Sequence, residues 1–336
     1  MKTHKSEEFD ANLHQIEGGQ TRASAKGRNR NLIILRAGDG SLHGSWLNPT
    51  SGARNWDLHI SYYGTRGVPV PLGGPDTTWS QDNDTSKWAG IATALSRGMF
   101  SLDDYEYIAL LDDDIITTTR ALNRAFDLAR EHNLAACQMS LYQDSFYEFL
   151  CWLRHPFLTL HYTSHIELMA PILRVDIMKR VEPYFALPNN LWAMDHIVGN
   201  IAGERPRSIA VLDEVSILHT RAYRSGETYK VFSGTDPKDA ERRFLEEHGF
   251  SRLERTIQGG LTRGRRFINS LWWTKIAFLR ARFIRRIRSL NPELSRIASA
   301  SDGRVTVMRR MEGTSGLPID YEKATGMKRR GFISLF

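Results

Sequence analysis

An apolar run that ends in three consecutive carboxylates is the feature that most constrains the fold of this chain. Residues 107–111 are apolar, and Asp112, Asp113 and Asp114 follow without a break. A short apolar run of this kind is typical of a strand buried on both faces of a sheet. Three carboxylates cannot share that interior, because each would lose its water without gaining a partner. The aspartates must therefore emerge at the carboxyl end of the strand, the edge at which open α/β sheets bind ligands.

These carboxylates have the chemistry of a site for a hard divalent cation. In an extended backbone Asp112 and Asp114 point the same way, since side chains alternate with a period of two. Two convergent carboxylates suit Mg²⁺ or Mn²⁺, whose coordination is typically completed by substrate phosphates and water. The alternative is that the aspartates only cap the next helix. Because Thr117, Thr118 and Thr119 offer caps nearer the expected helix start, we favour the metal site.

The rest of the pattern predicts an α/β fold with a mainly parallel sheet flanked by helices. Short apolar runs alternate with segments of helical periodicity, which is typical of parallel strands joined by crossover helices. We expect strands at 31–38, 56–63, 107–111, 134–139, 165–171 and 209–221. We expect helices at 85–99, 119–132, 175–181 and 191–198, and a Gly- and Pro-rich loop at 64–79.

Composition divides the chain into four parts. Residues 1–29 are polar and lack periodicity, which predicts a disordered tail. A catalytic domain is expected over 30–235, a basic helical extension over 236–295 and a loose segment over 296–336. Within 263–290, arginines surround apolar residues at helical spacing. This predicts an amphipathic helix that either binds an anionic membrane surface or packs on the catalytic domain.

The overall charge and the cysteines indicate a compartment and a class of partner. A net charge of +7 and a pI near 9.4 favour anionic partners. Cys137 and Cys151 lie in apolar sequence without metal-ligand spacing, as buried thiols of a reducing compartment do. The N-terminus lacks the apolar segment of a signal peptide, and no run approaches the roughly 18 apolar residues of a spanning helix. We therefore expect a cytoplasmic protein, free or peripherally attached to the membrane.

Two carboxylates stand inside apolar patterns, where an embedded acid needs a partner. These are Glu167 and Asp195. Asp195 is either a structural carboxylate paired with Arg205 or Arg207, or a general base, which would need the same partial burial in a cleft. The sequence leaves both interpretations of Asp195 open.

Two basic residues are candidates for the same site as the aspartates. Lys87, in the first turn of an expected helix, is by default a surface lysine, and its functional alternative is a contact to a diphosphate. His219 ends an apolar run, just as the aspartates do. Although a lone histidine is more often structural, this position favours a third metal ligand.

Four motifs, taken in order, carry a resemblance to a known family. They are the three aspartates after a strand, Glu167-Leu-Met-Ala-Pro171, Trp192-Ala-Met-Asp195 and Leu212-Asp-Glu-Val-Ser-Ile-Leu-His-Thr-Arg221. Over about residues 30–225 the chain resembles the domain family numbered 707, which is similar to nucleotide-sugar glycosyltransferases of the GT-A fold. The resemblance implies that Asp112 and Asp114 hold Mn²⁺ or Mg²⁺ against the donor diphosphate and that His219 completes the metal site. It also implies donor contacts from Asp112, Asp113 and Lys87.

The resemblance implies a metal-dependent glycosyltransferase that moves a sugar from a nucleotide-diphosphate donor to a glycan or glycolipid acceptor. A diphosphate leaves readily only when its developing charge is neutralised, which agrees with the metal site. If the reaction inverts the anomeric centre, Asp195 would deprotonate the acceptor, with Glu167 as the second candidate. The alternatives are another phosphate-handling enzyme, such as a nucleotidyltransferase or phosphoesterase, and a non-enzymatic basic module on anionic membrane or nucleic acid. Nucleic acid is the least favoured partner, because no nucleic-acid-binding motif accompanies the charge.

Overall fold

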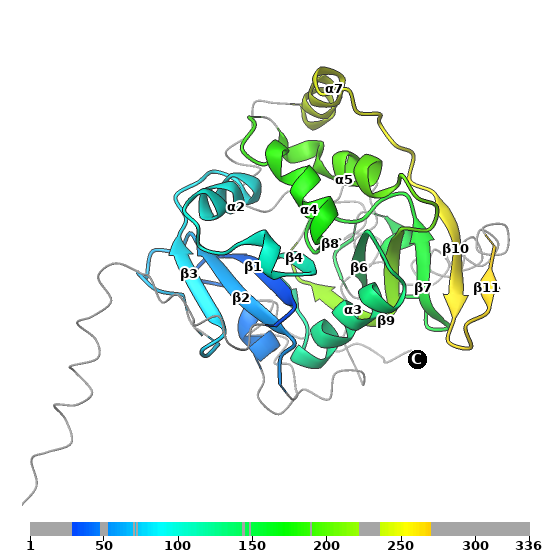
Figure 1. The fold of residues 1–336 in the computed structure, drawn as a ribbon, viewed down its shortest axis with the longest axis horizontal. Helices are drawn as coiled ribbons and strands as arrows, with labels where there is room; N and C mark the ends of the chain where they lie inside the picture. The colour runs from blue at the N-terminus through cyan, green and yellow to red at the C-terminus, as the bar shows by residue number, and fades with distance from the viewer. Residues whose placement is uncertain are drawn as a thin grey trace, which may run out of the picture.

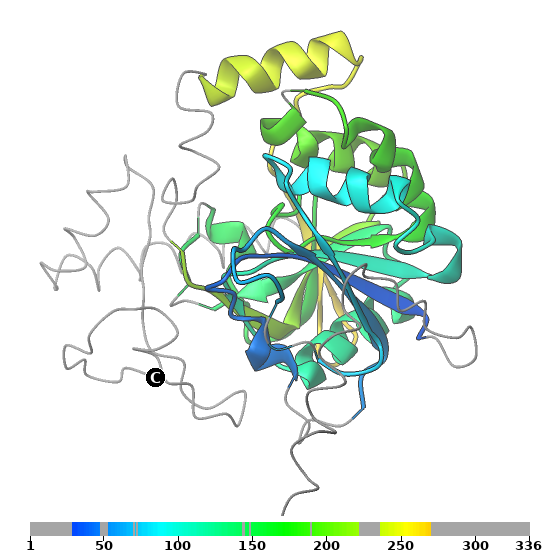
Figure 2. The same cartoon turned by 90° about the vertical axis from the view of Figure 1, so that its left-hand side faces the viewer.

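The computed structural model describes residues 29–47, 53–69, 71, 73–142, 145–147, 149–188, 190–221 and 236–269. Within them, one large sheet crosses the molecule and helices pack on both of its faces (Figures 1 and 2). The predicted tail, apart from Asn29, lies outside the described residues, as does the predicted loose segment at 296–336.

The sheet runs in the order β11-β10-β7-β9-β6-β8-β4-β1-β2-β3, with β5 paired to β9 off this path. Its strands are β1 (Asn31–Ala37), β2 (Trp56–Tyr62), β3 (Thr77–Gln81), β4 (Tyr107–Asp112), β5 (Ile115–Ile116), β6 (Ala136–Leu141), β7 (Leu158–Thr163), β8 (Ile172–Arg174), β9 (Ile209–His219), β10 (Ile257–Thr262) and β11 (Phe267–Ile268). The predicted strands 31–38, 56–63, 107–111, 134–139 and 209–221 are confirmed.

Strand direction confirms the predicted mainly parallel α/β class. β4, β1, β2 and β3 are mutually parallel, and β6 is parallel to β9. β8 separates these two groups and is antiparallel to both β4 and β6, so the two groups run the same way. β7, β8 and β11 are the strands of the path that run in the opposite direction.

Five α-helices cover the sheet. They are α2 (Lys87–Ser96), α3 (Thr119–Glu131), α4 (Val175–Val181), α5 (Met194–Ala202) and α7 (Pro237–Glu247) among the described residues. The period-two alternation of the strands decides which face each side chain meets. On β1, Leu32 and Ile34 pack with α2, α4, α5 and α7, whereas Ile33 and Leu35 face α3. Both faces of the central strands are therefore apolar, as their uninterrupted hydrophobic runs predict.

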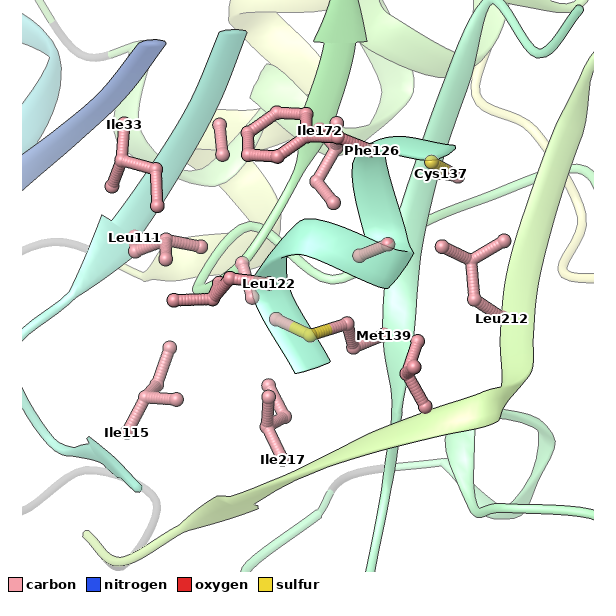
Figure 3. Close-up of a cluster of buried hydrophobic side chains, with 14 of the residues drawn as sticks. Ile33, Leu111, Ile115, Leu122, Phe126, Cys137, Met139, Ile172, Leu212 and Ile217 are labelled. Carbon is pink, nitrogen blue, oxygen red and sulfur yellow. The ribbon is translucent and has the colours of Figure 1, made fainter. Parts of the chain in front are cut away.

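The α3 face of this core is shown in Figure 3. Leu122 and Phe126 of α3 lie over Ile33 and Leu111 of the central strands, and all four are fully buried. α3 begins after Thr118, whose hydroxyl accepts a hydrogen bond from the backbone N–H of Ala121. A threonine thus supplies the cap, which leaves the preceding aspartates available for another role.

Four sequence predictions need correction. The strand expected at 165–171 is wrong, because the strand that follows is β8, Ile172–Arg174. β7, Leu158–Thr163, was not predicted. β3 was missed because it follows a Gly- and Pro-rich loop and is a half-exposed edge strand of polar sequence, Thr-Thr-Trp-Ser-Gln. The helix expected at 191–198 begins only at Met194, after a 3₁₀ turn at Asn190–Trp192.

The extension predicted as helical over 236–295 is helical only in part where it is described. After α7 the chain returns to the sheet, and β10 and β11 add a hairpin beside β7. The start of the amphipathic helix predicted over 263–290 is therefore wrong, because a turn and a short strand occupy 263–268. Residues 270–290 lie outside the described residues. Within the described part of the chain, no helix combines the length and apolarity needed to cross a membrane.

The buried His59 on β2 predicts a loss of stability in mild acid. Its ring lies 5.0 Å from the ring of Phe100, and its nitrogens bond the hydroxyls of Thr78 and Ser80. Burial lowers its pKa from 6.5 to about 4. The unfolded chain therefore binds a proton that the folded chain excludes, and stability falls as the pH drops from about 6.5 to about 4. We expect this residue to contribute up to about 3 kcal/mol of that loss.

Urea unfolding at several pH values between about 7 and 5 measures this effect. His59→Gln keeps hydrogen-bonding groups but cannot titrate, so its unfolding free energy should depend less steeply on pH than that of the unchanged chain. Equal pH slopes for the two proteins would contradict the assignment.

Candidate active site

Polar residues gather at one edge of the sheet because parallel strands end there together. β1, β2, β4 and β9 all run the same way, so their carboxyl ends share this edge. Gly38 follows β1 and Tyr63 follows β2. Asp112 ends β4, while His219 ends β9 and is followed two residues later by Arg221. Open α/β sheets bind ligands at this edge, which makes it the candidate active site.

The three aspartates do not form one extended run. β4 ends at Asp112, and Asp113 and Asp114 form a turn before β5. Strand alternation therefore does not orient Asp114, contrary to the prediction. Instead β5 pairs antiparallel with β9, and the backbone N–H of Thr220 donates to the Asp114 carbonyl at 3.0 Å. This pairing brings Asp114 beside His219.

Asp112 is held by a buried lysine. The Lys87 ammonium lies 2.7 Å from Asp112 Oδ1 and donates to the carbonyls of Leu110 and Leu168, each at 2.8 Å. An ammonium has three N–H donors, so these contacts saturate it. The side chain is 11% exposed, and the default interpretation of Lys87 as a surface lysine is wrong. Burial lowers the pKa of Lys87 and raises that of Asp112, while the attraction between the two groups opposes both shifts.

Asp113 ties together the ends of three strands. Its Oδ2 accepts hydrogen bonds from the Gly38 N–H after β1 and the Tyr63 hydroxyl after β2, each at 2.9 Å. Its Oδ1 lies 3.2 Å from Arg221 Nη2, after β9. A Cβ at Gly38 would lie 2.8 Å from the Tyr63 ring, so the glycine lets that ring reach Asp113. This buried carboxylate therefore fixes the geometry of the edge.

Asp114 faces two cations through one oxygen only. Its Oδ2 lies 3.5 Å from His219 Nε2 and 3.4 Å from Arg221 Nε. Burial raises the pKa of Asp114, but His219 and Arg221 outweigh it, so the pKa is lowered. Burial likewise lowers the pKa of His219, but Asp114 outweighs it and raises that pKa to about 9. His219 Nδ1 donates to the Phe146 carbonyl at 2.9 Å, which aims Nε2 at Asp114.

The second oxygen of Asp114 is the observation that tests a fit to a divalent cation. Asp114 Oδ1 is buried and accepts no hydrogen bond. An anionic oxygen left in this state is costly unless a cation or donor reaches it. Of the predicted ligands, Asp114 and His219 are in contact, whereas Asp112 is paired with Lys87 and its side chain is 38% exposed. Carboxylate oxygens with one imidazole nitrogen fit Mg²⁺ or Mn²⁺.

A second polar cluster lies at the start of α5. In the described part of the chain, one group of three side chains, His165, Asp195 and His196, brings potential metal-ligand atoms within 4.8 Å of one another. Most of their ligand atoms already have partners within the protein, and His196 Nε2 lies 3.3 Å from Glu241 Oε1. The Leu253 N–H donates to His196 Nδ1 at 3.1 Å, and His165 Nε2 lies 3.0 Å from that same nitrogen. Asp195 Oδ1 accepts from the His196 N–H at 2.9 Å. These bonds make the group a structural network.

Asp195 pairs with an arginine that the sequence did not suggest. Arg255 Nη2 lies 2.9 Å from Asp195 Oδ2, whereas Arg205 and Arg207, the predicted partners, are exposed and belong to another loop. The Arg255 guanidinium also lies over the Phe149 ring, 4.2 Å from its centroid. Burial raises the pKa of Asp195, against the opposing effects of His196 and Arg255. The carboxylate is therefore a better proton acceptor than an exposed one.

Segment 145–152 links the two clusters. The Phe146 carbonyl accepts from His219 of the first cluster, and the Phe149 ring stacks with Arg255 of the second. Glu167 is half-buried, its backbone N–H donates to the Gln138 side chain, and its charge is among the minor causes that raise the pKa of His219. Glu167 is therefore close enough to the first cluster for its charge to act on His219.

Three residues of these clusters were not predicted as site residues. Tyr63 directly follows β2 and Arg221 lies two residues after β9, and positions after a strand end could have marked them, since they marked the aspartates. Arg255 carries no such signal. It lies outside the predicted catalytic domain, and only the return of segment 251–256 along α5 places it on Asp195.

No protein-family model matches the chain, and no curated protein matches it. Several solved structures are similar to it in fold. Mannosyltransferase PcManGT from Pyrobaculum calidifontis, in complex with GDP-Man and Mn²⁺, is 13% identical with a TM-score of 0.46, over 73% of this chain and 72% of that one. TarS 1-349 from S. aureus, in complex with UDP-GlcNAc, is 14% identical with a TM-score of 0.43, over 67% of this chain and 68% of that one.

A further S. aureus TarS structure is 12% identical with a TM-score of 0.39, over 65% of this chain but only 42% of its own. The present chain thus spans less than half of that protein. Identities this low do not transfer a reaction from one protein to another. Because no family model matches, the resemblance to family 707 stays a prediction.

The saturated Lys87 ammonium predicts a strong effect of its removal. Lys87→Met keeps the aliphatic stem but leaves two carbonyls and Asp112 without their donor. We expect unfolding in urea to require about 2–4 kcal/mol less free energy. The control is Lys179→Met, which breaks an exposed pair with Asp103 and should cost less than about 1 kcal/mol. Equal losses of unfolding free energy in the two variants would show that the buried contacts of Lys87 stabilise the fold no more than an exposed ion pair does.

Proposed function

We propose that this chain is a metal-dependent glycosyltransferase that moves a sugar from a nucleotide-diphosphate donor to a glycan or glycolipid acceptor. The observation that carries the proposal is the buried, unpartnered Oδ1 of Asp114 at the carboxyl edge of the sheet. In this proposal Asp112, Asp114 and His219 hold Mg²⁺ or Mn²⁺.

The charge balance of the edge supports metal dependence. Asp112, Asp113 and Asp114 face the permanent cations Lys87 and Arg221, whereas His219, whose pKa Asp114 raises to about 9, must lose its proton before Nε2 can bind a metal. With His219 neutral, as a metal ligand must be, three formal negative charges meet two positive ones. An arriving diphosphate would add negative charge that this edge does not neutralise. A bound divalent ion supplies that charge and neutralises the leaving diphosphate.

The protein groups around the aspartates have separable roles in this proposal. Lys87 fixes the Asp112 carboxylate, and Asp113 fixes the strand ends, so both shape the site. Arg221 is the most exposed of the three cations, with 43% of its side chain accessible, and Asp114 and Asp113 raise its pKa against the effect of burial. It therefore keeps its charge and is the cation best placed to meet a donor phosphate.

Asp195 is the proposed general base of an inverting reaction. Its raised pKa favours proton uptake, and Arg255 and the His196 N–H hold its two oxygens in place. Each carboxylate oxygen keeps a second lone pair that can accept the acceptor's proton. Glu167, whose charge acts on His219, is the second candidate.

The metal assignment predicts loss of nucleotide binding when Asp114 is neutralised. Asp114→Asn keeps the side-chain shape but removes the anion that would bind the metal. We expect Mn²⁺-dependent thermal stabilisation by one of UDP, GDP, ADP, CDP or dTDP in the unchanged chain, and its loss in the variant and in EDTA. Asp103→Asn, which changes an exposed carboxylate, is the control. Undiminished metal-dependent binding by Asp114→Asn would overturn the assignment.

The base assignment predicts a different defect for Asp195→Asn. This variant should bind the donor nucleotide with Mn²⁺ as the unchanged chain does, yet transfer sugar to its acceptor at least about a hundredfold more slowly. Donor affinity by calorimetry and transfer by product analysis separate the two effects. Full transfer would remove Asp195 from the mechanism. Donor hydrolysis without any acceptor preference would instead favour a phosphoesterase.

A further inference from the structure

The tip of the β10–β11 hairpin exposes arginines and aromatic rings together. Residues 263–266 form the turn, and Arg263, Arg265 and Arg266 are all exposed. The Arg263 N–H donates to the Phe157 carbonyl at 3.4 Å, which places the loop before β7 against the turn. Phe157 is 74% exposed, and Phe267, just after the turn, is 40% exposed. We call these five residues the hairpin tip.

The hairpin tip begins the most basic part of the sequence. Between Glu254 and Glu293 there are nine arginines and one lysine, and no aspartate or glutamate. The remaining 35 Lys and Arg residues are outnumbered by the 38 Asp and Glu residues. This segment therefore carries a charge of +10 and the rest of the chain −3, so the net positive charge comes entirely from the segment.

Within the part of the chain that the structure describes, the acids nearest the hairpin tip are paired with another arginine. Glu131 and Glu214 both pair with Arg124, at 2.6 and 2.7 Å. Arg124, and more weakly Arg265, lower the pKa of Glu131, which places Arg265 near an acid that already has its own cation. The arginines of the tip therefore keep their charge for an external partner.

We propose that the hairpin tip docks on an anionic membrane surface. Exposed arginines gain free energy near anionic lipid headgroups, and exposed aromatic rings partition into the membrane interface. The hairpin lies at an edge of the sheet, where it can meet a flat surface (Figure 1). A lipid surface suits these features better than a single-stranded nucleic acid, which needs ring faces for stacking. One face of the Phe267 ring is covered by Arg207, 3.9 Å from its centroid, so Phe157 is the more exposed ring of the tip.

Vesicle sedimentation tests this proposal without reference to the reaction. The full chain should bind vesicles of phosphatidylcholine with about one-third phosphatidylglycerol and not pure phosphatidylcholine vesicles, and about 0.5 M salt should release it. Reversing the three tip arginines, R263E/R265E/R266E, should weaken binding at least about tenfold. Phe157→Ser should weaken it several-fold at an unchanged net charge.

The matched control is R97E/K238E/R243E, which makes the same change in net charge at exposed positions on or next to α2 and α7. These helices lie away from the hairpin in Figure 1. Equal weakening by the two triple variants would show that net charge alone acts and would overturn the proposal. So would an absence of vesicle binding, or tip-dependent binding to an RNA or DNA oligonucleotide with no affinity for vesicles. A glycosyltransferase without vesicle binding, or vesicle binding without transferase activity, would separate this proposal from the proposed function.

Discussion

Neutralising three adjacent carboxylates at the end of a buried strand is the constraint around which this structure is organised. Each aspartate meets a different set of donors: Asp112 meets Lys87, Asp113 meets Gly38, Tyr63 and Arg221, and Asp114 meets His219 and Arg221. These donors come from α2 and from the ends of β1, β2 and β9. The charges therefore hold the carboxyl edge of the sheet together, and an error in any of these elements would leave a buried anion unpaired.

The same contacts hold this edge in place and still leave one carboxylate oxygen without a partner. Lys87 and Asp113 have all their main partners within the protein, so they act as supports. Asp114 keeps one buried oxygen without a donor. Under the proposed function, a bound divalent ion would contact that oxygen and supply the positive charge that a diphosphate needs at this edge.

The segment after α7, residues 251–268, has two roles that its amino-acid composition does not indicate. Residues 251–256 run along α5 and bring Arg255 to Asp195, so the second polar cluster depends on a part of the chain beyond the predicted catalytic domain. The following hairpin then extends the sheet and exposes a basic, aromatic tip. One stretch of about twenty residues therefore supports a candidate base and presents a candidate docking surface.

Local patterns in the sequence were enough to predict the central strands, three of the helices and the edge that carries the candidate site, because local periodicity and the cost of burying charge are properties of short segments. It could not orient Asp114, since a turn and the β5–β9 pairing replace the strand geometry assumed for it. Nor could it find Lys87 buried, or Arg255 on Asp195, sixty residues away along the chain. Partners distant in sequence are chosen by packing, and only the tertiary structure decides which cation reaches which carboxylate.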